Sequence, residues 1–337
     1  MNLIAPNIKN GGGLELLLYL IEYIKKMHSD MKIVVYVDHS LQMLQSSDNI
    51  QVIHMDSNLK KIKLFSKRIN NALYFGNLPP LVKSKNSMVY FHNPYLLMPN
   101  SKLVRTSLKF FVKYFLQQIY IKNFISNIDI VACQNDYIKN KFVDKYSYHN
   151  VELLPFFRLC DRKLLGTSSK IYDFCYVSLA HPHKNHSRLI EACEILANES
   201  RSFTLALTIE DGHEELIEKL NDVNKKGNAN IINLGKLSKD DVCKLYSQSR
   251  CLIFPSTEET FGLGLIEAVN MDLDVIASDL EYVYQAVEPS LVFDPTNSLD
   301  ISLKMKEYLD GDVSKSKIKI ENKIDKLINF FEKYNNV

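Results

Sequence analysis

The sequence contains no apolar run that approaches the roughly 20 residues needed to span a bilayer. Its first residues also lack a basic segment followed by a long apolar stretch, so we expect no signal peptide. The six cysteines include no Cys-x-x-Cys pair and no metal-type spacing, and most of them lie in apolar runs. We therefore expect reduced, buried thiols and a cytoplasmic chain.

Several ligand-binding motifs are missing as well. The glycines of 11–13 are not followed by the Gly-Lys-Ser/Thr of a P-loop. His181, His183 and His186 lie close together, but no fourth ligand is nearby and Pro182 breaks the helical spacing, so we expect no metal site. The chain shows no nucleic-acid-binding motif and no internal repeat of solenoid length. We therefore expect no nucleic-acid partner.

What is present is a composition typical of soluble globular proteins, with 46% hydrophobic and 24% charged residues. The length of 337 residues is enough for two domains. The net charge is only +2, but residues 1–170 contain 23 Lys+Arg and 11 Asp+Glu, a net charge of +12. Residues 171–337 carry the compensating −10. This asymmetry predicts that the first half meets an anionic partner.

Short apolar strands alternate with helical patterns in the first half, which predicts a parallel sheet covered by helices. Residues 3–5, a glycine loop and a helix over about 14–26 form the first βα unit of a doubly wound domain. Further strands are expected at 33–37, 51–53, 72–75, 88–91, 128–132 and 150–157. Functional residues then belong at the carboxyl ends of the strands, where 76–80, 92–94 and 134–135 are polar or contain glycine.

A polar linker over 160–170 precedes a second alternating pattern. Its strands are expected at 173–178, 203–208, 230–235, 252–255, 275–279 and 291–295. A charged amphipathic helix over about 312–334 ends the chain. We predict an α/β chain with one domain over 1–160, a second domain over 171–312 and a terminal helix over 313–337.

The most informative pattern follows the strand at 252–255. A polar loop carries Glu258 and Glu259, and Phe261-Gly-Leu-Gly264 leads into an apolar helix start that holds Glu267. A strand that ends in a polar loop and a helix N-terminus is an anion site, and glycines allow a ligand to approach the backbone closely. The spacing lets Glu259 and Glu267 face one cleft.

This stretch resembles the donor-site signature of retaining glycosyltransferases of family 4, which have the GT-B fold of two doubly wound, Rossmann-like domains that face each other across a cleft. The matching positions are Pro255, Ser256, Glu259, Phe261, Gly262, Leu263 and Glu267. Residues 275–278 resemble the strand that follows in the family. The resemblance implies that 1–160 is the acceptor-side domain, that 171–312 binds the nucleotide sugar and that the helix over 313–337 crosses back to the first domain. Thr260 replaces the family's usual glycine, and Asp272-Leu-Asp274 replaces its usual turn.

The resemblance also assigns roles to single residues. Residues 181–186 resemble the family segment whose lysine contacts the donor diphosphate, and Lys184 takes that position. A second basic residue would fall at Leu179, so the second phosphate contact is unassigned. His92 resembles an acceptor-side histidine, although a structural, hydrogen-bonded histidine is the alternative. The implied catalytic residues are Glu259, Lys184 and His92. The implied donor-binding residues are Gly12, Gly13, Lys184, Leu237, Glu259, Thr260, Phe261, Gly262, Leu263 and Glu267.

By this resemblance, the chain moves a sugar from a UDP- or GDP-sugar to a glycan or lipid-linked acceptor with retention of configuration, as relatives in surface-polysaccharide synthesis do. Neither a metal nor another cofactor is implied. Another GT-B enzyme, such as a sugar-nucleotide epimerase, and a non-catalytic sugar-binding scaffold are the alternatives. Glu267 stands where a dinucleotide fingerprint needs its third glycine, which argues against NAD.

A basic helical pattern runs from about 102 to 115. Lys102, Arg105, Lys109 and Lys113 recur three and four residues apart, so they are expected to share one helix face. Aromatic and apolar residues fill much of the remainder. The pattern suits either a solvated stripe on a packed helix or a membrane and acceptor contact. We predict a peripheral contact with the anionic inner face of the plasma membrane.

Overall fold

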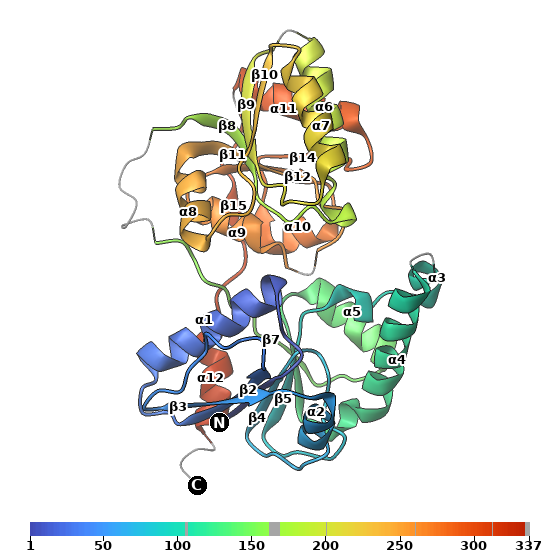
Figure 1. Cartoon of the computed structure of the whole chain (residues 1–337), viewed down its shortest axis with the longest axis vertical. Coiled ribbons are helices and arrows are strands. Elements are labelled where there is room, and N and C mark those ends of the chain that lie inside the picture. The colour runs from blue at the N-terminus through green and yellow to red at the C-terminus, as the bar shows by residue number, and fades with distance from the viewer. Residues whose placement is uncertain (105–106, 162–168, 200, 260, 312, 334–337) are drawn as a thin grey trace. The chain divides into compact units, whose positions relative to one another are not determined.

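The computed structural model of the chain describes all residues except 105–106, 162–168, 200, 260, 312 and 334–337, and it leaves the side chain of Lys102 undescribed (Figure 1). It divides into two compact units. The first comprises Met1–Arg158 and Glu321–Val337, and the second comprises Leu159–Ile320. Each unit is a parallel sheet covered by helices, so the predicted fold class of two Rossmann-like α/β domains is confirmed.

The first unit contains a seven-stranded parallel sheet in the order β3-β2-β1-β4-β5-β6-β7. The strands are β1 Asn2–Ala5, β2 Ile33–Asp38, β3 Ile50–Met55, β4 Ala72–Phe75, β5 Ser87–Phe91, β6 Ile130–Cys133 and β7 Val151–Leu153. Every residue of β4, β5 and β6 is buried, which explains why these strands appear in the sequence as continuous apolar runs.

Helices cover both faces of this sheet. They are α1 Gly11–Met27, α2 Asn58–Phe65, η1 Pro94–Leu96, α3 Asn100–Leu103, α4 Leu108–Phe124, η2 Ile125–Asn127, α5 Asp136–Tyr146 and α12 Ile324–Glu332. Apolar side chains of α1 and α12 share one core cluster with the sheet, and those of α2, α4 and α5 share another. No described helix of the chain is long and apolar enough to cross a membrane.

The predicted basic helix over 102–115 is interrupted. Lys102 belongs to the short α3, whereas Lys109 and Lys113 belong to α4. The side chain of Ser107 accepts a hydrogen bond from the backbone N–H of Phe110 and so begins α4 with an N-cap. The prediction that four basic residues share one helix face is therefore wrong. Arg105 and the side chain of Lys102 lie outside the described part.

The second unit contains a six-stranded parallel sheet in the order β10-β9-β8-β11-β12-β14 and an antiparallel pair, β13 and β15. The strands are β8 Tyr172–Tyr176, β9 Phe203–Leu207, β10 Ala229–Asn233, β11 Ser249–Phe254, β12 Asp274–Ser278, β13 Val287–Glu288, β14 Leu291–Phe293 and β15 Lys317–Ile318. The helices are η4 Pro182–Lys184, α6 His186–Asn198, α7 Glu214–Asn224, α8 Lys239–Gln248, α9 Leu263–Asn270, α10 Glu281–Ala286 and α11 Ser298–Asp310.

The terminal helix is shorter than predicted. Among the described residues from 313 to 333, only Ile324–Glu332 (α12) are helical, because Lys317 and Ile318 form β15 and pair with β13. The alternating Lys-Ile-Lys-Ile sequence at 317–320 has the period of a strand, and the helical period begins at Ile324. Four apolar side chains of α12 are buried in the core of the first unit.

Two of the six cysteines are not thiols. Cys160 and Cys243 form a disulfide with 5.7 Å between their Cα atoms, although 83 residues separate them. The other four cysteines, at 133, 175, 193 and 251, are buried and unpaired. The prediction of reduced, buried thiols is therefore wrong for this pair, because apolar surroundings suit a disulfide as well as a thiol. Because two cysteines form a disulfide, the cysteines no longer argue for a reducing compartment.

Candidate functional site

The first unit contains a cavity of about 590 Å³ at the point where the strand order of its sheet reverses. The strand order reverses between β1 and β4, and ligands of doubly wound sheets bind at such a switch point, beyond the carboxyl ends of the strands. Residues that follow β1, β4 and β5 line the cavity, together with residues of α4. The lining includes Lys9, Gly12, Gly13, Asn77, His92, Asn93, Tyr95, Lys113 and Gln117.

His92 follows β5 directly and forms part of this wall. Its backbone N–H donates to the Asn77 side chain at 2.7 Å, and its ring stacks on Phe75 with 5.2 Å between centroids. Burial lowers the pKa of His92 to about 4, because removal from water disfavours the charged imidazolium. The ring is therefore neutral at pH 7, and a neutral imidazole can exchange hydrogen bonds with a hydroxyl group.

Gly13 makes room for this histidine. A Cβ atom at Gly13 would lie 2.9 Å from His92 Nε2, whereas a Cβ atom at Gly12 would meet nothing within 4 Å. The two neighbouring glycines, both singled out in the sequence, thus differ in their surroundings. Gly13 permits a close approach of α1 to His92, and Gly12 leaves open space above the backbone.

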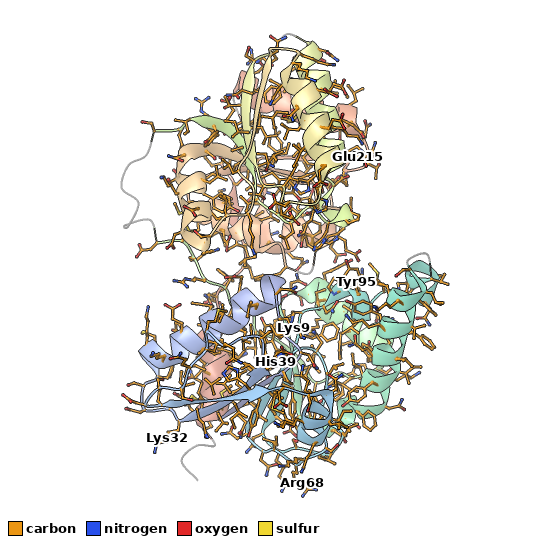
Figure 2. All side chains as sticks on the ribbon, viewed as in Figure 1. Lys9, Lys32, His39, Arg68, Tyr95 and Glu215 are labelled. Carbon is orange, nitrogen blue, oxygen red and sulfur yellow. A yellow bond between two sulfur atoms is a disulfide. The ribbon has the colours of Figure 1, made fainter. Side chains whose placement is uncertain are left out.

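Lys9 is held at the same cavity by a buried carboxylate. Asp38, at the end of β2, is 1% exposed and forms ion pairs with Lys61 at 2.6 Å and with Lys9 at 3.3 Å. Burial alone would raise the pKa of Asp38, but hydrogen bonds from Lys61 and from the Ser40 backbone outweigh it and hold the pKa well below its usual range. Figure 2 labels Lys9 and also His39, which neighbours Asp38.

A second cluster of predicted residues lies in the second unit, again at a switch point. The strand order reverses between β8 and β11, and Lys184 follows the first of these strands while Glu259 follows the other. Lys184 and Glu259 form an ion pair in which the side chains are 18% and 15% exposed. The charge of Lys184 thus lies beside the loop for which the sequence predicts an anionic ligand.

Backbone contacts tie the two loops of this cluster together. The N–H of Thr257 donates to the carbonyl of His183 at 2.8 Å. The Asn185 side chain donates to the carbonyl oxygens of Pro255 and Pro295 at 3.1 and 2.8 Å. These bonds position Lys184 against the loop that carries Glu259.

Helix α9 begins beside this ion pair. Gly262 precedes it with φ +68°, and no side chain caps the helix. A Cβ atom at Gly262 would also lie 2.8 Å from Leu265 Cδ1, so both the backbone conformation and the packing require glycine. An uncapped helix N-terminus presents backbone N–H groups and the positive end of the helix dipole to an anion.

Glu267 lies on α9 and pairs with a residue that the sequence analysis missed. Its side chain is 7% exposed and forms an ion pair with Lys239, which is 29% exposed. Lys239 stands in the first turn of α8, directly after the N-cap Ser238. The sequence pointed to Lys239 only indirectly, because Lys239 lies two residues after Leu237, a predicted donor-binding residue. Leu237 is half-buried in the structure.

The remaining predicted residues fall into three groups. Phe261, just before α9, is buried, and Leu263, the first residue of α9, is half-buried. Thr260 lies outside the described residues. Lys109 is exposed on α4 and is not part of the cavity lining, whereas Lys113 is part of it. The predicted residues thus gather at two places, one in each unit.

Comparison with known protein families gives a match in the C-terminal half of the chain. Residues 161–326 match the family model described as Glycosyl transferases group 1. The serotype-specific mannosyltransferase WbdA of Escherichia coli is 32% identical over 152 residues, which cover 43% of this chain and 18% of that protein. The O-antigen chain mannosyltransferase B of Escherichia coli is 27% identical over 186 residues, or 54% of this chain and 45% of that protein. The chain thus spans less than half the length of these two relatives.

Solved structures match almost the whole chain. Anabaena HepE, in complex with UDP and glucose, has a TM-score of 0.65 at 15% identity, with 92% of this chain and 90% of that one covered. WaaG, a glycosyltransferase involved in lipopolysaccharide biosynthesis, has a TM-score of 0.60 at 12% identity, with 98% and 99% covered. The chain has the GT-B fold of these glycosyltransferases, and its residues 161–326 match the glycosyl transferases group 1 family.

Proposed function

We propose that this chain is a retaining glycosyltransferase of family 4 that moves a hexose from a nucleotide sugar to a glycan or lipid-linked acceptor in the synthesis of a surface polysaccharide. The observation that carries the proposal is the Lys184–Glu259 ion pair beside the uncapped N-terminus of α9. The similarity to two O-antigen or serotype-specific mannosyltransferases makes mannose the first sugar to test.

The charges of this cluster suit the departure of a nucleoside diphosphate. Lys184 and the N–H groups of α9 stabilise the negative charge that develops on the leaving group. Glu259 accepts hydrogen bonds from sugar hydroxyls. Glu267 accepts two from the ribose diol, because a carboxylate can bind two donors at once.

The cavity of the first unit suits the acceptor. The amide side chains of Asn77, Asn93 and Gln117 line it, and each amide can both donate to and accept from a hydroxyl group. Neutral His92 adds a further polar contact for the attacking hydroxyl. We propose no metal or other cofactor in this reaction, because Lys184 and α9 supply the positive charge at the leaving group.

The first test is a thermal-shift screen of nucleotide sugars with the full chain, followed by a transfer assay. We expect GDP-mannose or a UDP-sugar to raise the melting temperature, and we expect labelled sugar to move to a lipid-linked acceptor equally well with and without EDTA. Loss of transfer in EDTA that magnesium or manganese restores would contradict metal independence. Conversion of the donor without an acceptor would indicate an epimerase, and binding without turnover would indicate a scaffold.

We further propose that the enzyme acts in the cytoplasm, on the inner face of a membrane, and that α4 makes the contact. Its side chains Leu108, Val112, Leu116 and Ile119 are 77%, 43%, 59% and 44% exposed, and their spacing places them on one face of the helix. Three lysines and no acidic residue accompany them on α4. Apolar residues beside basic residues suit the boundary between acyl chains and anionic headgroups.

Flotation with anionic liposomes tests this membrane contact. We expect the wild type to float at low salt and much less at high salt, because each lysine near the surface contributes about 1 kcal/mol. Leu108→Ser with Leu116→Ser should weaken flotation, and so should Lys109→Glu. Leu299→Ser with Leu303→Ser is the matched control, since these leucines are 50% and 47% exposed on α11 of the second unit. A wild type that remains unbound at low salt would disprove the contact.

A further inference from the structure

The N-terminal end of α9 is flanked by two lysine–carboxylate pairs rather than one. Lys184 pairs with Glu259, and Lys239 pairs with Glu267. The two lysines come from different elements, η4 and α8, and the four side chains together carry no net charge. Without a ligand, the cluster is thus electrostatically balanced.

A nucleoside diphosphate sugar changes this balance, because its diphosphate brings two negative charges close to two carboxylates. The N–H groups of α9 stabilise part of this charge, and cations of the site that turn toward the phosphates stabilise more of it. Lys184 is one such cation. Leu179, where the resemblance would place a second one, is an exposed apolar residue and supplies no charge, which leaves Lys239 as the other paired lysine beside α9.

The surroundings of Lys239 are suitable for this role. The Tyr246 hydroxyl of α8 would lie 3.5 Å from a Cβ atom at Gly264, so α8 packs closely against the first turn of α9. Cys243, one turn after Lys239, is tied to Cys160 by the disulfide. Helix α8 is therefore anchored, and the flexible stem of the lysine, already near Glu267, is the part that can move.

We propose that Lys239 exchanges partners when the nucleotide sugar binds: Glu267 passes to the ribose hydroxyls, and the Lys239 ammonium turns to the phosphate next to that ribose. The proposal rests on the function proposed above. The phosphate is carried on the 5′ carbon, across the ribose ring from the hydroxyls that Glu267 would hold, so the long flexible stem of Lys239 has to span the width of the sugar to reach it. Lys239 is then a phosphate-binding residue. Its pairing with Glu267 is the resting arrangement.

Calorimetric titration separates this role from a purely structural one. The ligands are guanosine, GMP and GDP, and the corresponding uridine series, with the full chain as wild type, Lys239→Gln and Lys239→Arg. We expect Lys239→Gln to weaken binding of the monophosphate and diphosphate by about tenfold or more, because a hydrogen bond between two charged groups is stronger than one between neutral groups. Binding of the nucleoside should change far less, and Lys239→Arg should retain most of the nucleotide affinity.

The controls distinguish the possible outcomes. Lys244→Gln alters an exposed lysine of the same helix and should leave all affinities unchanged. An equal loss for nucleoside and diphosphate would mean that Lys239 only positions Glu267, and no loss for either would mean that it contacts no part of the ligand; either result overturns the proposal. If the wild type binds no nucleotide of either series, the proposed function fails together with this inference.

Discussion

Replacing Lys184 with methionine is expected to lower kcat/KM for sugar transfer by about 10²–10³-fold, because the removal of one preorganised group that stabilises developing charge commonly costs about 2.7–4 kcal/mol of barrier. Methionine retains most of the length of the side chain and removes its charge. The measurement is initial-rate kinetics with the nucleotide sugar identified by the thermal-shift screen. Glu259→Ala should have an effect of similar size, since it removes the partner of Lys184 and the proposed sugar contact.

Lys226→Met is the matched control for Lys184→Met. Lys226 also pairs with a glutamate, Glu194, at 2.8 Å. It lies in the loop between α7 and β10, and the residues before parallel strands lie at the edge of the sheet opposite the one that carries Lys184 and Glu259. The control variant should keep wild-type rates. A well-folded Lys184→Met enzyme with near wild-type turnover would show that this lysine does not stabilise the leaving group.

Gly13→Ala is expected to lower the free energy of unfolding of the first unit by about 1–3 kcal/mol, the usual effect of overpacking. The added Cβ would approach His92 Nε2 to 2.9 Å, and the ring is confined by its stacking on Phe75. Acceptor-dependent transfer should also fall, because His92 lines the cavity. The measurement is residue-level hydrogen exchange of α1 and β5, which reports the free energy of opening in the first unit alone. A local measurement is needed because the two units can unfold separately.

Gly12→Ala provides the comparison. Its Cβ would meet no atom within 4 Å, and the residue lies in helix α1. Alanine there should stabilise the unit by about 0.4–1 kcal/mol, because the unfolded chain loses conformational freedom. If both glycine variants shift the free energy of unfolding in the same direction, the close approach of Gly13 to His92 does not limit which residue is accepted at position 13.

A comparison of single elements shows which parts of the structure could be predicted from the sequence. The predicted strand at 72–75 coincides with β4, because a strand buried on both faces is a continuous apolar run that needs no knowledge of its neighbours. The loop and helix that carry Glu259 and Glu267 were also predicted, since glycines, carboxylates and an apolar helix start follow one another within a short stretch. The break between α3 and α4 was missed, because the basic residues keep a helical spacing across it.

The sequence by itself determined the two alternating α/β patterns, the charge asymmetry and the residue types of both candidate sites, because periodicity and strand-end chemistry are properties of neighbouring residues. The tertiary structure alone decided which residues meet. The pairing of Lys239 with Glu267, the disulfide between Cys160 and Cys243 and the approach of Gly13 to His92 each join segments that are far apart in the chain. Such contacts depend on the order of the strands in each sheet, and short-range patterns carry no information about that order.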